Sequence, residues 1–581
     1  MTVMRGADGI LETLREDGTD LVVGYIGHTT QELADASQQV AGLRAVHPAT
    51  ELGGAHMING YNIVKGRAAA AGIWHTCGTM LIPAALMEGM ESRIPSVHLG
   101  LNVDAEFKDR EAMQEMNHLE VLRPLTRYAT RVERPGKLPE AIHRAVQRSQ
   151  GNPMGPTFLD IPFDLTIDTA EMQIPTGGSV PSTRVGVNPD DAQAIAAMLI
   201  SASRPVLVVG GGTVASGAAE EIKQLAELLG IPVTTTHTAQ GILSELHPMS
   251  LGSSGPIGWK CANEWLNVAD VVLAVGTRTS EWGWAQSYGA SLEGRLIHID
   301  LDPAQIGNFY FPEIGVAADA KTTLRQVIET VRSTSGFESK PFQERDHYAQ
   351  FTKLKQEWLK EMGERATSDE TPISPWRVMR DIESQLSPED IIVSDAGNNT
   401  GWVFQGAVSE RHHRLITSYG AGILGAGFPM ALGVKMAAPH ANVVAAVGDG
   451  GFGYGTNEIS FALRENVPVT VVVFNDGELG ANYGFMNYLY GEASWTHLEN
   501  PDFAALAKAY GAQGERVESP DQIADAVRRG IDSQAPYIID VPISQKIGYP
   551  ATGGGAKVRW EPRQWPLNGN GTQAPANFAR R

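Results

Sequence analysis

The stretch "VVAAVGDGGFGYGTNEISFALRENVPVTVVVFNDGELGANYG" runs from Val443 to Gly484. It contains an apolar run, a glycine-rich turn, an amphipathic segment and a second apolar run, which is the pattern of a βαβ unit. Each apolar run is followed by a small acidic turn, which holds Asp449 in the first case and Asp476 in the second. The stretch therefore predicts two aspartates at the ends of neighbouring parallel strands.

Open parallel sheets bind ligands beyond the carboxyl ends of their strands. Two carboxylates that lie close together repel each other, and a cation is the simplest reason to hold them there. Oxygen ligands beside a helix N-terminus suit Mg²⁺, which is usually completed by phosphate oxygens. Gly448, Gly450 and Gly451 would let backbone N–H groups approach such a phosphate. Either acidic turn alone would be interpreted as a turn that binds no ligand. The two together predict a magnesium and phosphate site.

The composition bounds the other possibilities. A chain of 581 residues predicts about three domains, and 42% hydrophobic residues are enough for ordinary globular cores. The formal net charge of −20 disfavours nucleic acids and anionic membrane surfaces as partners. The net charge does not bear on small anions, which respond to local charge only.

The two cysteines, Cys77 and Cys261, cannot form a disulfide framework and lack the spacing of a zinc site. The N-terminal segment shows no apolar signal-peptide core, and no apolar run approaches the length of a membrane helix. These features predict a reduced, cytoplasmic setting and no membrane partner.

Helical and strand patterns alternate along almost the whole chain, which predicts an α/β fold of doubly wound parallel sheets. Two polar stretches, 167–191 and 333–350, interrupt the alternation and are interpreted as linkers. The predicted domains are residues 1–180, 190–335 and 365–545. Residues 546–581 are rich in Gly, Pro and Asn and are expected to form an irregular tail.

The acidic stretch closely resembles the signature of thiamine-diphosphate enzymes, which begins with Gly-Asp-Gly and ends with a polar pair after the second strand. The resemblance implies three α/β domains of the pyruvate oxidase and acetolactate synthase type. It also implies that Mg²⁺ is held by Asp449, Asp476 and the backbone carbonyl of Glu478. The sequence departs from the family at Asp476, where the family usually has asparagine.

The same family requires a glutamate from its N-terminal domain. "HPATELGGAHMINGYNIVKG" supplies Glu51, nine residues before Gly60. The resemblance implies that this carboxylate hydrogen-bonds the aminopyrimidine of the cofactor and promotes removal of the C2 proton. Outside this context, Glu51 would be interpreted as a charge at a helix N-terminus.

Two further stretches align with the parts of the family that hold the cofactor. "TSYGAGILGAGFPMALG" aligns with the turn that keeps the cofactor bent, which places Gly422 there and Leu424 in the supporting position. "SDAGNNTGW" aligns with the loop that contacts the diphosphate, which implies roles for Gly397, Asn398 and Asn399.

The middle third resembles the central domain of acetohydroxyacid synthases, in which FAD or an ADP-like group lies. The resemblance rests on "PVLVVGGGTV", "ADVVLAVGTRTSEWG" and "LIHIDLDPAQIG". Some family members leave this domain empty, so bound FAD and an empty domain both stay open. The positions carried over for FAD are Gly211, Gly212, Arg278, Asp300 and Asp319.

Residues near the reacting carbon choose the substrate. The usual Thr-Ser-Gly-Pro-Gly loop of acetolactate synthases is replaced by "WHTCG", which contains His75. His28 lies in "YIGHTT", Asn102 replaces a glutamine in "GLNV", and Asn482 lies in "GANYGFMN". With "PATELGGA", "FYFP" and "SEWGWAQSY", these stretches resemble the cyclohexane-1,2-dione hydrolases. Gln114 aligns with a family position near the substrate.

Three functions stay open at this stage. The resemblance favours a hydrolase or lyase that cleaves a C–C bond of a 1,2-diketone. The first alternative is a carboligase of the acetolactate synthase type that decarboxylates pyruvate or another 2-keto acid. The second is a catalytically silent nucleotide-binding protein, which would have no need of Glu51 or Leu424. The resemblance also implies a homodimer or homotetramer, with each active site between two chains.

Overall fold

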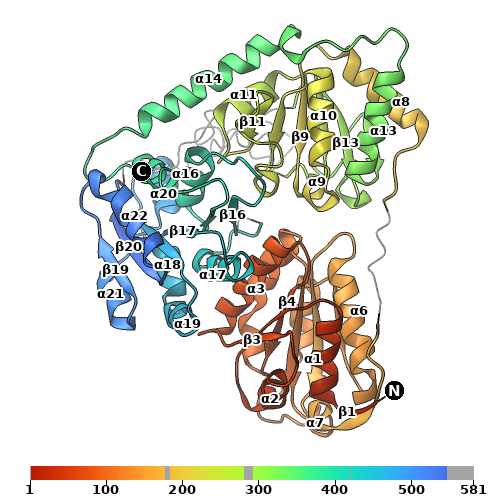
Figure 1. Ribbon diagram of the computed structural model, residues 1–581, viewed down its shortest axis with the longest axis vertical. Coiled ribbons are helices and arrows are strands. Elements are labelled where there is room, and N and C mark those ends of the chain that lie inside the picture. Colours follow the sequence, from red (N-terminus) through yellow and green to blue (C-terminus); the bar gives the residue numbers. More distant parts are fainter. Residues whose placement is uncertain (1, 177–183, 281–291, 419, 546–581) are drawn as a thin grey trace.

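The computed structural model describes residues 2–176, 184–280, 292–418 and 420–545. Within these ranges the chain forms three six-stranded parallel sheets, each covered by helices, which confirms the predicted fold class. The N-terminal, middle and C-terminal domains lie around a common centre (Figure 1). The predicted tail, 546–581, and most of the "SEWGWAQSY" stretch lie outside the described residues.

The N-terminal sheet has the strand order β3-β2-β4-β5-β7-β6. The chain changes direction across the sheet between β2 and β4, so a crevice is expected beyond the ends of these two strands. The strands are β2 (Leu21–Gly24), β3 (Arg44–Val46), β4 (Ala70–Trp74), β5 (Ser96–Asn102), β6 (Tyr128–Arg131) and β7 (Pro156–Pro162). The helices are α1 (Gly6–Glu16), α2 (Gln31–Ser37), α3 (Glu51–Lys65), α4 (Pro83–Glu91), α5 (His118–Leu122), α6 (Leu138–Gln150) and α7 (Asp164–Ile167).

A short antiparallel pair lies outside this sheet. β1 (Thr2–Arg5) pairs with β8 (Thr169–Met172), which lies inside the stretch interpreted as a linker. Met172 is buried, and its sulfur lies 2.5 Å from the position that a Cβ on Gly9 would occupy. The beginning of that stretch is therefore fixed to the N-terminal domain by packing as well as by strand pairing.

The middle sheet has the strand order β11-β10-β9-β12-β13-β14, with its change of direction between β9 and β12. Its strands are β9 (Pro205–Val209), β10 (Val233–Thr235), β11 (Ser250–Ser253), β12 (Val271–Val275), β13 (Arg295–Asp300) and β14 (Ile314–Ala317). Its helices include α8 (Pro189–Ser201), α9 (Gly211–Ser216), α10 (Ala219–Leu229), α11 (Lys260–Val268) and α13 (Ala320–Ser333).

A long helix connects the middle and C-terminal domains. α14 (Tyr348–Arg365) begins inside the second stretch interpreted as a linker and packs against α11. Phe351, Lys355, Trp358 and Met362 are buried at helical spacing, so one face of α14 belongs to the protein core. The polar residues before it hid this periodicity in the sequence.

The C-terminal sheet has the strand order β16-β15-β17-β18-β20-β19, and its change of direction lies between β15 and β17. The strands are β15 (Ile391–Ser394), β16 (Leu415–Thr417), β17 (Val443–Gly448), β18 (Thr470–Asn475), β19 (Gln513–Arg516) and β20 (Tyr537–Pro542). The helices are α15 (Pro375–Glu383), α16 (Asn398–Gly406), α17 (Gly427–Ala437), α18 (Asp449–Gly455), α19 (Ile459–Arg464), α20 (Gly480–Tyr490), α21 (Phe503–Tyr510) and α22 (Ile523–Asp532).

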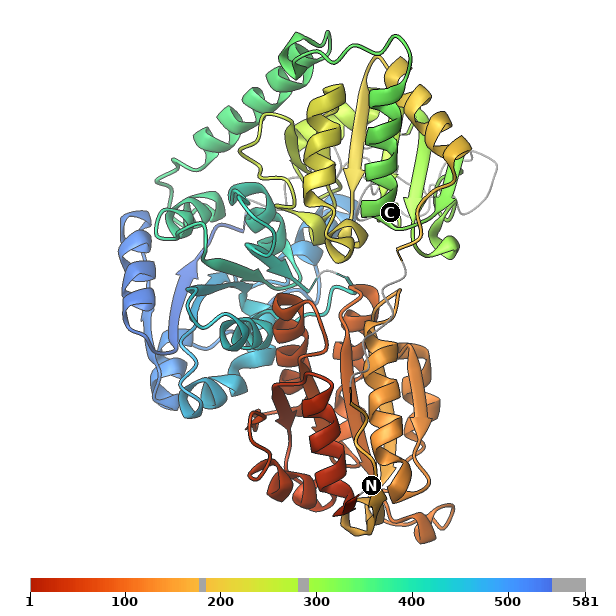
Figure 2. The same cartoon turned by 45° about the vertical axis from the view of Figure 1, so that its right-hand side comes forward.

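The N-terminal and C-terminal domains are joined by the packing of α3 against α17, which lie side by side in both ribbon views (Figures 1 and 2). A Cβ on Gly60 would lie 2.2 Å from the carbonyl oxygen of Met430, and one on Gly433 would lie 2.0 Å from that of Met57. These two contacts make the helices antiparallel. Because only glycine permits such an approach, both glycines are expected to tolerate no side chain.

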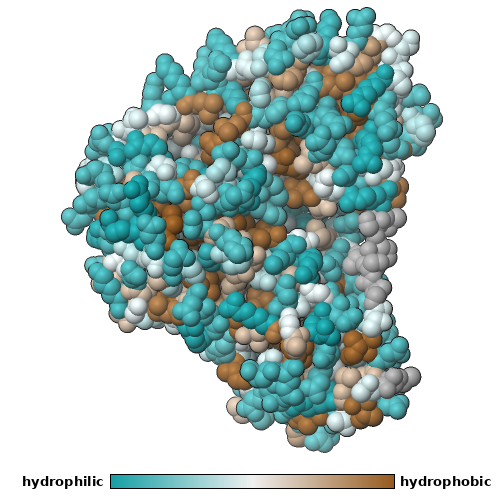
Figure 3. All heavy atoms as spheres, in the orientation of Figure 1, coloured by the Kyte–Doolittle hydropathy of each residue, from teal (hydrophilic) through white to brown (hydrophobic). Residues whose placement is uncertain are grey.

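The face of the molecule that is seen in Figure 1 is covered mostly by hydrophilic side chains, with hydrophobic patches between them (Figure 3). In the part of the chain that the structure describes, no helix has the length and apolar character that crossing a membrane requires.

Candidate active site

The two acidic turns meet at the carboxyl edge of the C-terminal sheet. Gly448 on β17 pairs with Phe474 on β18, so both strands end at the same level. Oδ2 of Asp449 accepts hydrogen bonds from the Gly477 N–H over 2.8 Å and from Nδ2 of Asn500 over 2.6 Å. The first turn is thus bonded directly to the second. We call this region, with Asp449 and Asp476 at its centre, the acidic edge.

The electrostatics of the acidic edge favour a cation. Burial raises the pKa of Asp449 above its ordinary value. Burial, followed by repulsion from Asp449, raises the pKa of Asp476 to about 7. A divalent cation between the two carboxylates would remove both penalties, because it compensates for lost solvation and for the mutual repulsion.

Further oxygen atoms surround these carboxylates. Within the described ranges, Oδ1 of Asn398 and Oε2 of Glu478 are buried without a hydrogen-bond partner. A Cβ on Gly480 would lie 2.6 Å from Oδ2 of Asp476 and 3.0 Å from Nδ2 of Asn398, so α16, α20 and the second turn converge here. The described residues show no cluster of three or more Asp, Glu, His or Cys side chains around a metal position. The edge therefore fits Mg²⁺ whose coordination is completed by phosphate oxygens.

A third buried aspartate organises the neighbouring turn. Asp395 follows β15, and the Gly425 N–H donates to both of its carboxylate oxygens, over 3.1 and 2.9 Å. Burial raises its pKa to about 7. A Cβ on Gly451 would lie 2.2 Å from Oδ2 of Asp395, so this carboxyl also contacts the start of α18. Sequence reasoning missed Asp395, although it carries the same signal as the other two, an aspartate directly after an apolar strand.

The turn that contains Leu424 is held from both sides. Gly422 and Gly425 have φ values of +70° and +89°, which strongly favour glycine. Leu424 is half-buried. The carboxylate of Glu88, on α4 of the N-terminal domain, accepts hydrogen bonds from the N–H groups of Gly420 and Ala421 over 3.1 and 2.9 Å. Its partners lie more than 300 residues away in the sequence, so no local pattern indicated this role.

The predicted diphosphate loop lies between these features. Gly397 has a φ of +124° and immediately precedes α16. Nδ2 of Asn399 donates to the carbonyl oxygens of Asp395 and Ala446, which fixes the loop against β17. Asn398 is the member of the pair whose side-chain oxygen stays available, as described above.

Glu51 is the first residue of α3 and is 6% exposed. A Cβ on Gly78 would lie 2.2 Å from Oε1 of Glu51, so the "WHTCG" loop packs directly against this carboxyl group. Nε2 of His75 lies 3.6 Å from the same oxygen. Glu458, from the C-terminal domain, accepts hydrogen bonds from the N–H groups of Ala49 and Thr50 and so anchors the start of α3. Glu458 was not predicted from the sequence.

The loops that carry the two predicted histidines contact each other at the direction change of the N-terminal sheet. Gly27, beside His28, lies so close to His75 that a Cβ there would be 2.6 Å from the imidazole Cγ. The hydroxyl groups of Thr29 and Thr76 lie 3.4 Å apart. His28 itself is exposed, and its ring centroid lies 5.3 Å from that of Phe163. The N-terminal domain therefore brings His28, His75 and Glu51 to one edge.

The remaining substrate-side residues have other positions. Nδ2 of Asn102 donates to the carbonyl oxygen of Met116 over 2.8 Å and to Oδ1 of Asp160 over 3.0 Å, so its amide is engaged in the protein interior. Gln114 is exposed, with a φ of +70°, on the loop that follows β5. Asn482 is exposed on α20, in the C-terminal domain.

Within a single chain, Glu51 at the start of α3 lies far from the turn of Leu424, which precedes α17. When the antiparallel register of the two glycine contacts is extended, the start of α17 falls opposite Ile63, which lies roughly 18 Å along α3 from Glu51 at 1.5 Å per residue. Leu424 precedes the start of α17, whereas Glu51 lies towards the end of α17. The structure of a single chain therefore does not bring Glu51 to the turn of Leu424.

The direction change of the middle sheet lies beside the predicted flavin residues. Gly211 begins α9, and a Cβ on Gly212 would lie 2.8 Å from the Cα of Gly276, so the glycines permit close backbone packing. Burial raises the pKa of Asp300, at the end of β13, to about 6. A glycine-rich turn at Gly211 and Gly212 and a carboxyl group at Asp300 are the types of group that bind nucleotides.

The other two predicted flavin residues have protein partners. Nη1 of Arg278 donates to Oε2 of Glu91 in the N-terminal domain over 2.5 Å. Asp319 is the N-cap of α13, where it accepts hydrogen bonds from the N–H of Thr322 and the hydroxyl of Ser216. Their assignment to FAD stays a prediction, and residues 281–291, which follow Arg278, lie outside the described ranges.

Comparisons with known proteins match all three domains. Family models of the thiamine pyrophosphate enzymes match residues 4–121 as the N-terminal TPP binding domain, 192–327 as the central domain and 395–541 as the C-terminal TPP binding domain. The chain is 30% identical over 569 residues to a probable acetolactate synthase large subunit of Methanocaldococcus jannaschii, with 96% of this chain and 94% of the relative covered.

Two other relatives extend this comparison. An acetolactate synthase of Mycobacterium bovis is 28% identical over 555 residues, which cover 93% of this chain and 87% of the relative. A sulfoacetaldehyde acetyltransferase of Castellaniella defragrans is 28% identical over 574 residues, which cover 94% of each chain. The similarity thus extends over nearly the whole length of enzymes that have different activities.

Proposed function

Because the chain belongs to the thiamine pyrophosphate enzyme family, we propose that it breaks or forms a carbon–carbon bond next to a carbonyl group, with thiamine diphosphate and Mg²⁺ as cofactors. The observation that carries this proposal is the acidic edge, where Asp449 is buried and the half-buried Asp476 lies close enough for the two carboxylates to repel each other, at the ends of two parallel strands. When bound, thiamine diphosphate supplies a nucleophilic carbon that adds to carbonyl groups.

The residues of this chain then have defined tasks. Asp449, Asp476 and the backbone carbonyl of Glu478 would hold Mg²⁺, and the N–H of Gly451, at the start of α18, would face phosphate oxygens. The Gly450 N–H instead donates to Oδ1 of Asp449 over 2.8 Å. Leu424 would support the bent cofactor from the turn that Asp395 and Glu88 fix. Glu51 would hold a proton at the aminopyrimidine, and its buried position excludes water from that contact.

The roughly 18 Å that separate Glu51 from the start of α17 support a site shared between two chains. We propose a homodimer as the smallest active unit, in which the N-terminal domain of one protomer supplies Glu51 to the acidic edge of its partner. A homotetramer of two such dimers satisfies the same requirement.

The relatives support carboligation as the first candidate reaction. Two of those named above are acetolactate synthases and one is an acetyltransferase. In this reaction a 2-keto acid such as pyruvate loses CO₂, and the remaining two-carbon unit is joined to a second carbonyl compound. His75 and Asn482 would then serve to orient the acceptor.

A specific observation favours hydrolytic cleavage of a 1,2-diketone as the second candidate. His75 lies 3.6 Å from Glu51, and the loop of His28 contacts His75. Diketone cleavage releases no CO₂, so the protein must move protons during carbonyl hydration and after bond breakage. Imidazole groups can transfer protons near neutral pH, and Asn482 can donate to an oxyanion without titrating. Carboligation after decarboxylation depends less on such proton transfers.

One experiment tests the proposal and separates the two candidates. Purified protein with both cofactors is incubated with pyruvate and, separately, with a panel of linear and cyclic 1,2-diketones, and products are followed by mass spectrometry together with CO₂ release. Carboligation yields CO₂ and a joined product, whereas hydrolytic ring opening yields an oxo acid heavier than the diketone by one water. Turnover that is unaffected by removal of thiamine diphosphate and Mg²⁺ would contradict the proposal itself.

A further inference from the structure

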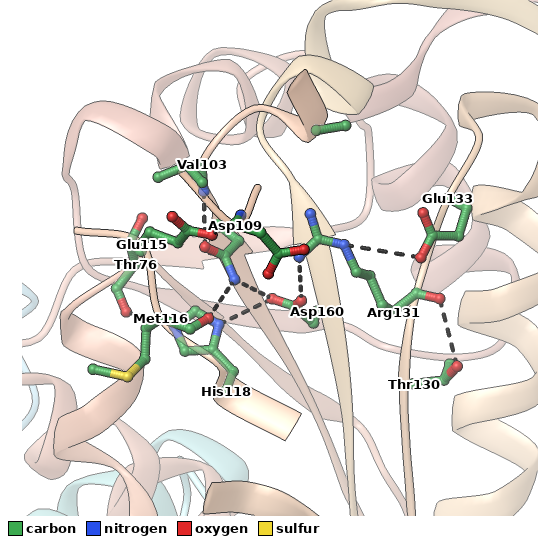
Figure 4. Close-up of polar contacts among 12 residues, drawn as sticks. Thr76, Val103, Asp109, Glu115, Met116, His118, Thr130, Arg131, Glu133 and Asp160 are labelled. Atoms are coloured by element: carbon green, nitrogen blue, oxygen red, sulfur yellow. Dashed lines mark hydrogen bonds and ion pairs between the residues drawn. The ribbon is translucent and has the colours of Figure 1, made fainter. Parts of the chain in front are cut away.

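A buried histidine links the floor of a cavity to the loop beside Glu51. His118 begins α5, is fully buried and lies between two acceptors (Figure 4). Its Nδ1 lies 3.0 Å from Oδ1 of Asp160, and its Nε2 lies 2.9 Å from the backbone oxygen of Thr76. The ring thus connects β7 with the loop that follows β4.

Both contacts require the histidine to donate. A backbone carbonyl oxygen has no proton to give, so Nε2 must carry the hydrogen of the contact with Thr76. Asp160 also accepts from Nη1 of Arg131 over 2.8 Å and from Nδ2 of Asn102 over 3.0 Å. Burial acts to raise the pKa of Asp160, but the contact with His118, followed by the hydrogen bond from Asn102 and the charge of Arg131, holds it below its ordinary value. An ionised Asp160 therefore accepts the hydrogen on Nδ1, and the ring is fixed at both nitrogens.

The loop held in this way carries the groups that face Glu51. Thr76 lies between His75, whose Nε2 is 3.6 Å from Glu51, and Gly78, whose backbone packs against the same carboxyl group. Two hydrogen bonds inside the loop, from Thr79 to His75 and from Met80 to Cys77, shape it locally. They do not fix its position relative to the sheet. The hydrogen bond from His118, 42 residues away, ties the loop to the buried end of β7.

The same network forms part of a cavity wall. Asn102, Arg131 and Asp160 line an open cavity of about 800 Å³ that is also lined by residues of the loop after β5. Glu115 in that loop accepts backbone hydrogen bonds from Asp109 and Ala112, which keeps the loop folded over the cavity. Asp160 therefore connects the cavity wall, through His118, to the loop of His75.

We propose that His118 is a positioning residue that, together with Asp160, fixes the backbone of Thr76 so that the loop 74–78 presents His75 and Gly78 to Glu51. This inference rests on the proposed function, because it assigns the loop a role beside the cofactor. It gives His118 no contact with the substrate. Its effect is transmitted by a single backbone oxygen.

Two near-isosteric substitutions separate the two halves of the contact. In His118→Gln the amide nitrogen reaches the position of Nε2, so the hydrogen bond to Thr76 can persist while the one to Asp160 is lost. In His118→Asn the amide nitrogen takes the position of Nδ1, so the bond to Asp160 can persist while the one to Thr76 is lost. Each variant removes one hydrogen bond of the same buried network, so similar losses in melting temperature are expected from both.

The first readout needs neither cofactor nor substrate. Hydrogen exchange of cofactor-free protein is followed by mass spectrometry on peptides that cover residues 74–82. In His118→Asn the amides of Thr79 and Met80 should exchange about tenfold faster than in the wild type, because the loop loses its anchor. In His118→Gln they should exchange at nearly the wild-type rate. Equal exchange in both variants and the wild type would overturn the proposal.

The second readout is the exchange of the C2 proton of bound thiamine diphosphate. Small displacements of reacting groups cost up to about 10²-fold in rate, so His118→Asn should slow this exchange by that order while His118→Gln stays within a few-fold. Wild-type protein that accelerates C2 exchange together with two variants that match it would refute the role of His118 and leave the proposed function intact. Wild-type protein without any acceleration would refute the proposed function instead.

Discussion

The acidic edge of the C-terminal domain and the Glu51 region of the N-terminal domain are built in different ways, although both lie at the carboxyl edge of a parallel sheet. The acidic edge takes its carboxylates from two turns of one βαβ unit, and its hydrogen bonds join residues of the same domain. The Glu51 region takes its loops from three strands and is anchored by Glu458 of another domain. A short motif can therefore identify the first region, whereas the second exists only after the chain has folded.

The largest expected effect belongs to Glu51. Glu51→Gln keeps the size of the side chain but removes its ability to accept a proton, and general acid–base groups contribute roughly 10²- to 10⁴-fold to rates. The exchange of the C2 proton of bound thiamine diphosphate should slow by this factor, while calorimetry should show cofactor affinity close to that of the wild type. An unchanged exchange rate would remove Glu51 from its proposed role and leave only the acidic edge.

Two substitutions test how the protein selects its substrate. His28→Ala changes the N-terminal domain, and Asn482→Ala changes the C-terminal domain. Loss of an oxyanion donor costs about 10²- to 10³-fold, so each variant should lose diketone cleavage by this order while it keeps its bound cofactor. The space that opens should allow ligation of 2-keto acids such as pyruvate. Wild-type cleavage rates in both variants, or a wild type that prefers pyruvate over every diketone, would favour the carboligase.

The acidic edge should respond most strongly to Asp449→Ala. This change removes a direct metal ligand, and because outer-shell changes alone cost 10- to 100-fold in metal affinity, a loss of at least about 100-fold is expected. Titration calorimetry with Mg²⁺ and thiamine diphosphate measures it. Glu499→Ala removes an exposed carboxylate near the same turn and is the matched control. Equal affinities in the two variants would contradict the metal assignment.

The smallest effect is a pH dependence that Asp476 gives to metal binding. Since its pKa is raised to about 7 without metal, Mg²⁺ must displace a proton below that pH. The affinity should fall by up to about tenfold per pH unit below pH 7 and level off above it. Asp476→Asn, which restores the usual family residue, should show near-normal affinity and a flatter profile. Identical profiles for the variant and the wild type would assign the titration to another group.

These differences explain which parts of the site could be predicted from the sequence. Asp449 and Asp476 were found because their position after apolar strands is a local signal that survives folding. Leu424 and Glu51 were found only through the resemblance to a family. Glu88, Glu458 and His118 were missed, because each acts through partners that lie 42 or more residues away.

In the middle domain the assignment of residues to FAD stays a prediction. Arg278 and Asp319 were predicted to bind FAD from short matches, and the structure engages both with protein partners, Glu91 and Ser216. Strand ends and turns follow from the pattern of apolar residues, but the partner of a charged side chain depends on distant packing. A sequence match therefore indicates where a carboxylate or guanidinium lies, whereas what it binds requires a separate test.

The central claim is that Glu51 and the acidic edge of different protomers form one site, and mixing two inactive variants tests it most directly. Glu51→Ala protein is combined with Asp449→Ala protein under conditions in which native mass spectrometry shows subunit exchange, and turnover is measured with the substrate, pyruvate or a diketone, that the wild type converts. Half of randomly mixed dimers are hybrids with one intact site each, so about one quarter of wild-type activity should return. If hybrid dimers form and no activity returns, each site is built within one chain and the claim is contradicted.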